Sequence, residues 1–263
     1  AYLKPEVSNG LYDNAELISR SLAGIRKNGL VKRLESSFYA FQVSLDNFRQ
    51  ANKNMIDMFN RDKVFIAPVL DINNLLESGY TDEEIEEKLN AKAEDNPKNS
   101  VFKAEDFKPE FIEMLQSDQD TLEKMCKAWE KITDADDSKF AKFNELLKHE
   151  LFKEDRNPEQ KLVVFSESVD TVKYLERRIN RKDVLVISAD NRSKLFKTIR
   201  ENFDANYKTK LNDYNIILTT DVLAEGVNLH RANVIVNYDT PWNSTRLMQR
   251  IGRVNRIGSV SKH

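Results

Sequence analysis

Four short runs in the second part of the chain are apolar at every position, and they constrain the fold more than any other feature. The runs are 162–165, 184–187, 216–218 and 234–236. Strands without polar residues are covered on both faces, as in parallel sheets. Amphipathic helical stretches at 172–179 and 195–203 lie between the runs. This alternation predicts a doubly wound parallel α/β sheet that is built by right-handed crossovers.

The sequence before these runs has a helical pattern instead. Apolar residues recur at steps of three or four at Leu34, Phe38, Phe41, Leu45 and Phe48. This spacing places them on one face of a helix. The pattern changes at Asn157-Pro158. We therefore expect a mostly α-helical region at 1–157, as an insertion or an accessory, and an α/β lobe at 158–263.

Composition excludes several classes of protein. The chain of 263 residues is 40% hydrophobic and 32% charged, and its net charge is −2, so it is not a globally basic nucleic-acid binder. No apolar run approaches the roughly 18 residues of a membrane helix. The lone Cys126 can form neither an internal disulfide nor a cysteine metal site, and a cytoplasmic location is expected. We predict no metal site on this chain.

The arginines near the end of the sequence are the strongest functional signal. Arg250, Arg253 and Arg256 recur at every third position, so on a helix they point in the same general direction. Gln249 precedes them, and Gly252 allows another backbone to approach closely. Planar guanidinium groups suit the negative charge of a phosphoryl group in transfer. The plain alternative is a solvated basic helix.

Hydroxyl side chains follow two of the predicted strands. Thr219 and Thr220 come directly after the third apolar run and can offer hydroxyl and amide groups to a phosphate. A Thr-Thr-Asp sequence after a strand is also an ordinary helix cap. Ser166 and Ser168 follow the first run in the same way. Because parallel sheets bind ligands beyond the carboxyl ends of their strands, all four residues are candidates for a site.

Taken in order, these segments resemble the C-terminal motor lobe of superfamily 2 helicases and translocases. Three segments resemble conserved motifs: 163–168 resembles motif IV, 216–229 motif V and 249–258 motif VI. The Glu-Gly-x-Asn sequence at 225–228 and the Asp-x-Pro-Trp-Asn sequence at 239–243 resemble the Swi/Snf and RapA-like branch. A weaker match at 33–41 resembles a helix that leads into this lobe in some RapA-like bacterial enzymes. The resemblance implies a RecA-like fold.

The resemblance also implies a role for individual residues. The residues expected to be catalytic, two of them as arginine fingers for the γ-phosphate of ATP, are Arg253, Arg256 and Gln249. Contacts to the nucleotide are expected from Glu225, Gly226, Asn228 and Arg250. For Arg250 the residues leave a second role open, in which it braces the helix against Asp239 or another acid. Contacts to the nucleic-acid backbone are expected from Ser166, Ser168, Thr219 and Thr220.

Two parts that such a motor needs are missing from the sequence. Gly24 and Gly29 have the spacing of a phosphate-binding loop, but Leu30-Val31 follows them instead of Lys-Ser/Thr. Asp82-Glu83 has the residue types of a magnesium-binding pair, but the residues before it are not typical of a strand. We therefore expect ATP with Mg²⁺ to bind between this lobe and an N-terminal motor lobe of the same protein, which holds the Mg²⁺ ligands. The chain alone is expected to be inactive.

Nucleic acid is the expected partner, and no membrane is expected to be involved. The Swi/Snf-like sequence favours double-stranded DNA over RNA, by analogy within the family. The alternative is a non-catalytic nucleic-acid-binding or partner-binding module derived from a helicase lobe. The intact glutamine and three arginines at 249–256 argue against this alternative. A lobe that had lost its catalytic activity would not need arginine fingers.

Overall fold

The computed structural model describes residues 2–8, 27–67, 70–91, 100–223, 227–241 and 243–254. The chain divides into two compact units, each described here by itself. The first unit comprises Ala1–Gly29 and Ser44–Lys131, and the second comprises Leu30–Val43 and Ile132–His263. The second unit therefore combines an early segment of the chain with the whole of its C-terminal half.

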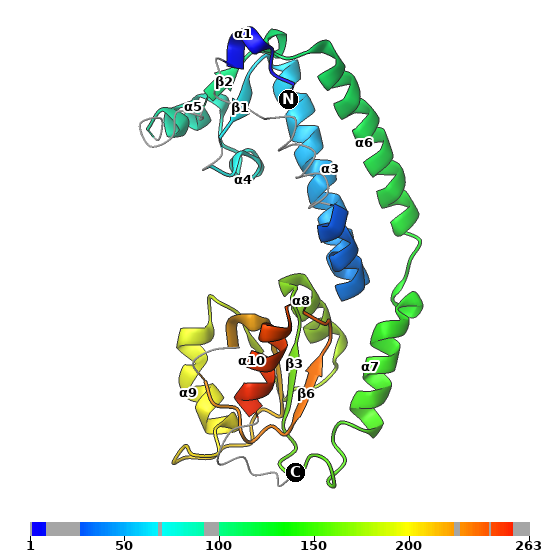
Figure 1. Ribbon diagram of the computed structural model, residues 1–263, viewed down its shortest axis with the longest axis vertical. Helices are drawn as coiled ribbons and strands as arrows, with labels where there is room; N and C mark the ends of the chain where they lie inside the picture. The colour runs from blue at the N-terminus through cyan, green and yellow to red at the C-terminus, as the bar shows by residue number, and fades with distance from the viewer. Residues whose placement is uncertain are drawn as a thin grey trace. The chain divides into compact units, whose positions relative to one another are not determined.

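A four-stranded sheet forms the centre of the second unit (Figure 1). Its strands are β3 (Leu162–Phe165), β4 (Val184–Ile187), β5 (Ile216–Thr219) and β6 (Val234–Asn237). The strand order is β4-β5-β3-β6, and all three neighbouring pairs are parallel. Each apolar run of the sequence is one of these strands. The predicted parallel α/β sheet is therefore confirmed.

Helices cover both faces of this sheet. They are α7 (Ser138–His149), α8 (Val169–Arg178), α9 (Arg192–Phe203) and α10 (Ser244–Val254), and a short 3-10 turn, η3, lies at Asp221–Leu223. Leu162 and Val164 of β3 pack with α7 and α8, whereas Val163 and Phe165 pack with α9 and α10. This alternation follows from the two-residue period of a strand. It also explains why the apolar runs within the strands contain no polar residue.

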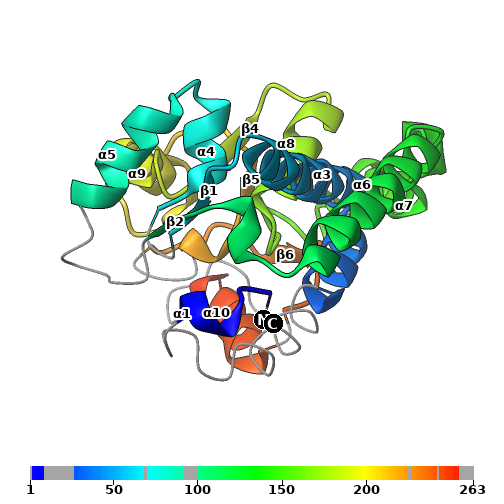
Figure 2. The same ribbon diagram turned by 90° about the horizontal axis from the view of Figure 1, so that it is seen from above.

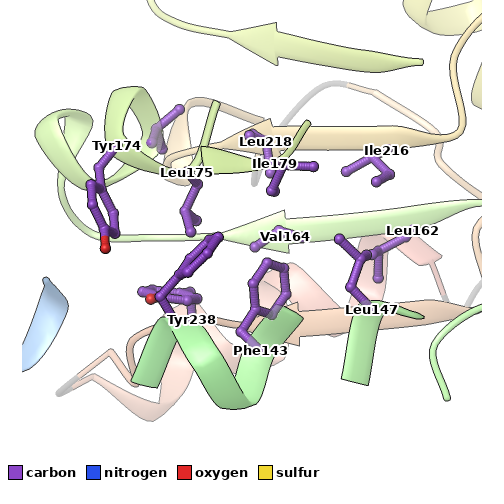
Figure 3. Close-up of a cluster of buried hydrophobic side chains, with 12 residues drawn as sticks. Phe143, Leu147, Leu162, Val164, Tyr174, Leu175, Ile179, Ile216, Leu218 and Tyr238 are labelled. Atoms are coloured by element: carbon purple, nitrogen blue, oxygen red, sulfur yellow. The ribbon is translucent and has the colours of Figure 1, made fainter. Parts of the chain in front are cut away.

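The core between the sheet and α7 shows that α7 belongs to the second unit. Phe143 and Leu147 of α7 lie against Val164 and Leu162 of β3 (Figure 3), and all four side chains are buried. Burying one such side chain contributes roughly 1.5–3 kcal/mol. The structure therefore groups α7 with the sheet, although α7 precedes the change of sequence pattern at 157.

An upstream segment also belongs to the second unit. Residues 27–36 are helical, and α3 (Phe38–Asn60) begins directly after Ser37. Ala40 and Phe41 are buried, and the ring of Tyr39 stacks on that of Tyr174 from α8 at a centroid distance of 6.1 Å. Residues 30–43 are thus packed on the α/β lobe, which is where the weaker match at 33–41 falls.

The first unit is mostly helical, as predicted. Its elements are α1 (Pro5–Ser8), the part of α3 from Ser44, β1 (Val64–Ile66), α4 (Ile72–Glu77), α5 (Asp82–Ala91), β2 (Ser100–Phe102), the 3-10 turn η1 (Ala104–Asp106) and α6 (Pro109–Trp129). α3 and α6 lie side by side (Figures 1 and 2), and Asn52 donates hydrogen bonds of 2.8 Å to the Leu115 carbonyl and 3.0 Å to Gln119. No described helix combines the length and the apolar character of a membrane span.

Two short strands that the sequence did not indicate, β1 and β2, also lie in this mostly helical region. These strands pair antiparallel, with Val64 opposite Phe102. Each has three residues, which is too short to show a two-residue period in the sequence. Their pairing depends on the burial of Val64, Phe65 and Phe102 in one core with residues of α3, α5 and α6.

Candidate functional site

The carboxyl ends of β3, β5 and β6 carry most of the predicted site residues. Thr219 at the end of β5 is fully buried, and its Oγ1 donates a 3.1 Å hydrogen bond to the carbonyl of Ile187 in β4. Thr220, the next residue, is half-buried. Thr219 therefore ties two strands together, and Thr220 is the more accessible of the two hydroxyls.

Ser166 and Ser168, after β3, are buried as well. The Ser166 Oγ donates to the carboxylate of Asp239 at 2.6 Å. Ser168 caps α8, where its Oγ accepts from the backbone N–H of Thr171 at 3.3 Å, and it also accepts from Arg33 at 2.7 Å. Both hydroxyls thus have partners inside the lobe. Their contact with nucleic acid stays a prediction.

Asp239 is the centre of this hydrogen-bond network. Its Oδ2 accepts from the hydroxyls of Ser36 at 2.5 Å and Ser166 at 2.6 Å, and its Oδ1 accepts from the backbone N–H of Glu167 at 2.6 Å. Ser36 belongs to the upstream helical segment and contacts Thr171 at 2.7 Å. The ends of β3 and β6 are therefore joined to residues 27–36. Ser36 lies within the weak match at 33–41, which gave no reason to single it out.

Lys139 of α7 binds the C-terminal end of the upstream helical segment 27–36. Its ammonium donates to the carbonyls of Glu35 at 2.6 Å and Ser36 at 2.9 Å, where a helix exposes unpaired carbonyls and favours a cation. It also lies 4.3 Å from the centre of the Tyr238 ring. Burial lowers the pKa of Lys139, and the nearby carboxylate of Asp239 opposes this shift.

Arg250 of α10 is the most completely buried residue of the predicted site. None of its surface is exposed, its Nε donates to Asp221 Oδ1 at 2.6 Å, and its Nη1 donates to Asn237 Oδ1 at 2.9 Å. The guanidinium lies 5.2 Å from the centre of the Phe165 ring. Arg250 therefore braces α10 against an acid, which is Asp221, and its contact with the nucleotide stays a prediction. Arg250 is thus tied inside the lobe.

The other predicted residues of α10 and of the loop before β6 are placed differently. Arg253 and Gln249 are half-buried on α10, and the carbonyl of Arg253 accepts from the N–H of Leu229 at 3.1 Å. Asn228 is half-buried in the same loop. Arg256, Glu225 and Gly226 lie outside the described residues. The roles predicted for these six residues stay predictions.

Asp221 and Arg246 are two polar residues of this edge that the sequence did not single out. Asp221 follows Thr220 directly, and Arg246 lies one helical turn before Arg250. Arg246 Nη1 is 3.3 Å from Asp221 and 3.6 Å from Glu167, and its side chain is 54% exposed. The four-residue spacing of the two arginines is the signal that could have paired both with one acid.

The donor set at this edge suits a polyphosphate better than a metal ion. Guanidinium groups and side-chain amides donate hydrogen bonds to phosphate oxygens. Arg246 and Arg253 on α10 supply guanidinium groups, and Asn228, next to the Leu229 that bonds to Arg253, supplies an amide. In the part of the chain that the structure describes, no three His, Cys, Asp or Glu side chains are grouped to hold a metal. A nucleotide phosphate therefore fits the residues present.

Open parallel α/β sheets bind ligands beyond the carboxyl ends of their strands, which is where the arginine-bearing helix α10 is tied. The family described as the helicase conserved C-terminal domain matches residues 138–258. This segment is therefore similar to the helicase C-terminal domain family, in agreement with the motifs in the sequence.

Curated relatives are similar to part of the chain. The probable ATP-dependent RNA helicase ddx51 of Dictyostelium discoideum is 31% identical over 114 residues, which is 41% of this chain and 20% of the relative. The ATP-dependent RNA helicase ROK1 of Meyerozyma guilliermondii is 32% identical over 103 residues, or 38% of this chain and 18% of the relative. The uncharacterized ATP-dependent helicase YqhH of Bacillus subtilis is 49% identical over 43 residues, or 16% and 8%.

The chain thus spans about a fifth of the length of the first two relatives. Among solved structures, the C-terminal part of the Fun30 ATPase domain matches with a TM-score of 0.39 and 17% identity, over 84% of this chain and 78% of that chain. The fold assignment rests on the sheet and helices described above. The Swi/Snf and RapA-like branch is a finer assignment than these matches make.

Proposed function

We propose that the second unit is the C-terminal motor lobe of an ATP-dependent helicase or translocase. The observation that carries the proposal is the anchoring of α10. Arg250 fixes this helix to the strand ends through Asp221, and Arg253 follows on the same helix inside a segment that matches the helicase C-terminal domain. Arg253 is thereby held on a rigid element, as an arginine finger requires.

In this proposal, Arg253 and Arg256 meet the γ-phosphate of ATP when a first motor lobe closes on the second. Bound ATP with Mg²⁺ supplies the phosphoryl group and the cation that shields it, and the Mg²⁺ ligands come from the first lobe. Gln249 orients groups at the same phosphate. Contacts to the remainder of the nucleotide are proposed for Glu225, Gly226 and Asn228.

Gly252 supports an approach to α10 from outside this lobe. A methyl group placed at Gly252 would meet no described atom within 4 Å. Packing within the described residues therefore does not require glycine, although glycine costs a helix interior about 1 kcal/mol relative to alanine. Glycine at this position leaves room for a surface that comes close to α10, such as the first lobe with its nucleotide. This need for space explains why the helix contains a glycine despite its cost.

For nucleic acid, we propose Thr220 as the main hydroxyl contact of this lobe to the backbone. Thr219, Ser166 and Ser168 are buried and already hydrogen-bonded inside the lobe. They support the loops that carry the contact. The accessible hydroxyl after β5 is left to bind a phosphate oxygen.

We further propose double-stranded DNA as the substrate, because the sequences at 225–228 and 239–243 resemble the Swi/Snf and RapA-like branch. The relatives named above as RNA helicases favour RNA instead. Stimulation of ATP hydrolysis in the intact protein by duplex DNA and by single-stranded RNA of equal length decides between them. Stronger stimulation by RNA would refute the choice of duplex DNA and leave the motor function intact.

The motor function is tested with Arg253→Ala and Arg256→Ala in the intact protein. An arginine finger contributes about a thousandfold or more to turnover in related phosphoryl-transfer systems. We expect nucleic-acid-stimulated hydrolysis to fall by at least about a hundredfold, with nucleic-acid affinity changed by no more than a few-fold. Arg256→Lys should also be impaired, because an ammonium cannot reproduce the planar fork of a guanidinium.

Arg156→Ala is the matched control, because the Arg156 side chain is 68% exposed and its ion pair with Glu150, at 3.7 Å, lies on the surface. It should hydrolyse ATP at the wild-type rate. Wild-type rates for both Arg253→Ala and Arg256→Ala would refute the motor proposal and favour the non-catalytic binding module.

A further inference from the structure

Asp221 is shared by two arginines that lie on successive turns of α10. Its Oδ1 accepts from Arg250 Nε at 2.6 Å, and its Oδ2 accepts from Arg246 Nη1 at 3.3 Å. Asp221 itself begins the η3 turn directly after β5 and Thr220. One carboxylate therefore joins the end of the central sheet to two points of the helix that carries Arg253.

The Arg250 contact places a full charge inside the lobe. Arg250 is completely buried, and its Nη2 has no hydrogen-bond partner among the described residues. Among the described residues, the Asp221 carboxylate is the ion-pair partner of this guanidinium, at 2.6 Å. A buried cation that loses its counter-charge is strongly destabilised. The position of Arg250, and with it the middle of α10, thus depends on Asp221.

The Arg246 contact fixes the beginning of the same helix. Arg246 lies between Asp221 and Glu167, and Glu167 in turn lies 3.5 Å from Lys32 of the upstream helical segment. Two anchors one turn apart fix both the rotation of α10 and its position along its axis. Arg253 lies one turn beyond Arg250, so its direction follows from these anchors.

We propose that Asp221 is a positioning residue for the arginine finger: through Arg250 and Arg246 it sets the direction from which Arg253 meets a phosphate. The proposal rests on the motor function proposed above. Asp221 touches no reacting atom in this scheme, because both of its oxygens are held by arginines of its own lobe. A displacement of about 1 Å at a reacting group can lower a rate about a hundredfold. The anchoring of α10 is therefore expected to appear in turnover.

The test compares Asp221→Asn and Arg246→Ala with the wild type in the intact protein. For Asp221→Asn we expect kcat of nucleic-acid-stimulated hydrolysis to fall by at least about tenfold, while KM for ATP changes by less than about threefold. Arg246→Ala removes one exposed anchor, so it should fold with a Tm near that of the wild type and lose about threefold or more in kcat. Added to Asp221→Asn, it should have little further effect, because both changes remove the same contact.

A second measurement needs no nucleotide. Amide hydrogen exchange within 246–254 of the 263-residue chain should be faster in Asp221→Asn and Arg246→Ala than in the wild type or Arg156→Ala. If Asp221→Asn does not fold, Arg246→Ala alone carries both measurements. Wild-type kcat and wild-type exchange in folded variants, while Arg253→Ala is inactive, would overturn the positioning role only. Equal activity of Arg253→Ala and the wild type would remove the motor proposal and this inference together.

Discussion

At the scale of single residues, Gly252 is a position where the stability of α10 and its proposed function favour different residues. It lies in the interior of the helix, where a glycine is unfavourable. A side chain of one methyl group would meet no described atom within 4 Å. The backbone there has no conformation that only glycine can adopt. Alanine is therefore compatible with the lobe taken by itself.

We predict that Gly252→Ala stabilises the 263-residue chain by about 0.5–1 kcal/mol, because alanine lowers the entropy of the unfolded chain and favours helix. In the intact protein the same change should reduce nucleic-acid-stimulated ATP hydrolysis, because the methyl group obstructs the surface that closes on α10. Urea denaturation and steady-state turnover measure the two effects. Lys197→Ala, on an α9 side chain that is 76% exposed, is the control. A variant with full activity would show that no surface approaches Gly252.

Residue types at this site were predictable, but their burial was not. The three-residue spacing of Arg250 and Arg253 indicated a shared direction, whereas the structure buries Arg250 entirely and leaves Arg253 half-buried. Thr219 and Thr220 are likewise adjacent and different. Thr219 is occupied by the Ile187 carbonyl of β4, a contact that depends on the strand order β4-β5. Apolar runs carry no information about which strand lies next to which.

At the scale of elements, the helical segment 27–36 is attached to the lobe mainly by polar contacts. Asp239 accepts three hydrogen bonds, from Ser36, Ser166 and the N–H of Glu167. A carboxylate can do this because it has acceptors on both oxygens. The side-chain amide of asparagine has only one oxygen acceptor. Its NH2 group would point two hydrogen-bond donors towards the donors of this cluster.

Asp239→Asn should therefore destabilise the second unit by about 2–3 kcal/mol, since at least one buried donor loses its acceptor. Hydrogen exchange in residues 27–43 should accelerate more than in β3 or β5, because those strands keep their ladders. Denaturation together with exchange mass spectrometry measures both effects. Asp190→Asn, at an exposed position, should change stability by less than about 0.5 kcal/mol. Unchanged exchange in 27–43 would mean that Asp239 does not hold this segment.

The sequence predicted a helix or strand well where the local order of apolar and polar residues indicated it. The four strands of the sheet were visible because each packs against an apolar core on both faces. The attachment of 27–36 was not visible, because its serines pair with groups that only the folded lobe brings near. The same holds for β1 and β2, whose pairing comes from the core around Phe102 rather than from local sequence.

At the scale of the whole chain, the net charge of −2 averages over two very different segments. Five of the six residues at 82–87 are acidic, whereas 245–263 contains five Arg or Lys residues and no acid. A near-neutral total therefore does not argue against contacts to a polyanion. It limits the number of such contacts.

We predict that the 263-residue chain binds nucleic acid weakly and with a clear dependence on salt. Each phosphate contact contributes about 0.7–0.9 to the slope of log affinity against log salt concentration. Two or three contacts would lower the affinity roughly tenfold or more between 50 and 200 mM salt. Fluorescence anisotropy with a labelled duplex and a labelled RNA strand, each at several salt concentrations, measures the slope. Tight binding that ignores salt would contradict a single motor lobe and favour a dedicated binding module.

The division of the second unit into two stretches of chain has a consequence during synthesis. Ser36 meets Ser166 and Asp239, which follow it by 130 and 203 residues. A ribosome that adds about 5–20 residues per second delivers Asp239 roughly 10–40 s after Ser36. Ser44–Lys131 emerges within that interval. The nascent upstream segment is therefore made long before its partners, and the first unit can finish folding before the second unit, which begins at Leu30, can close.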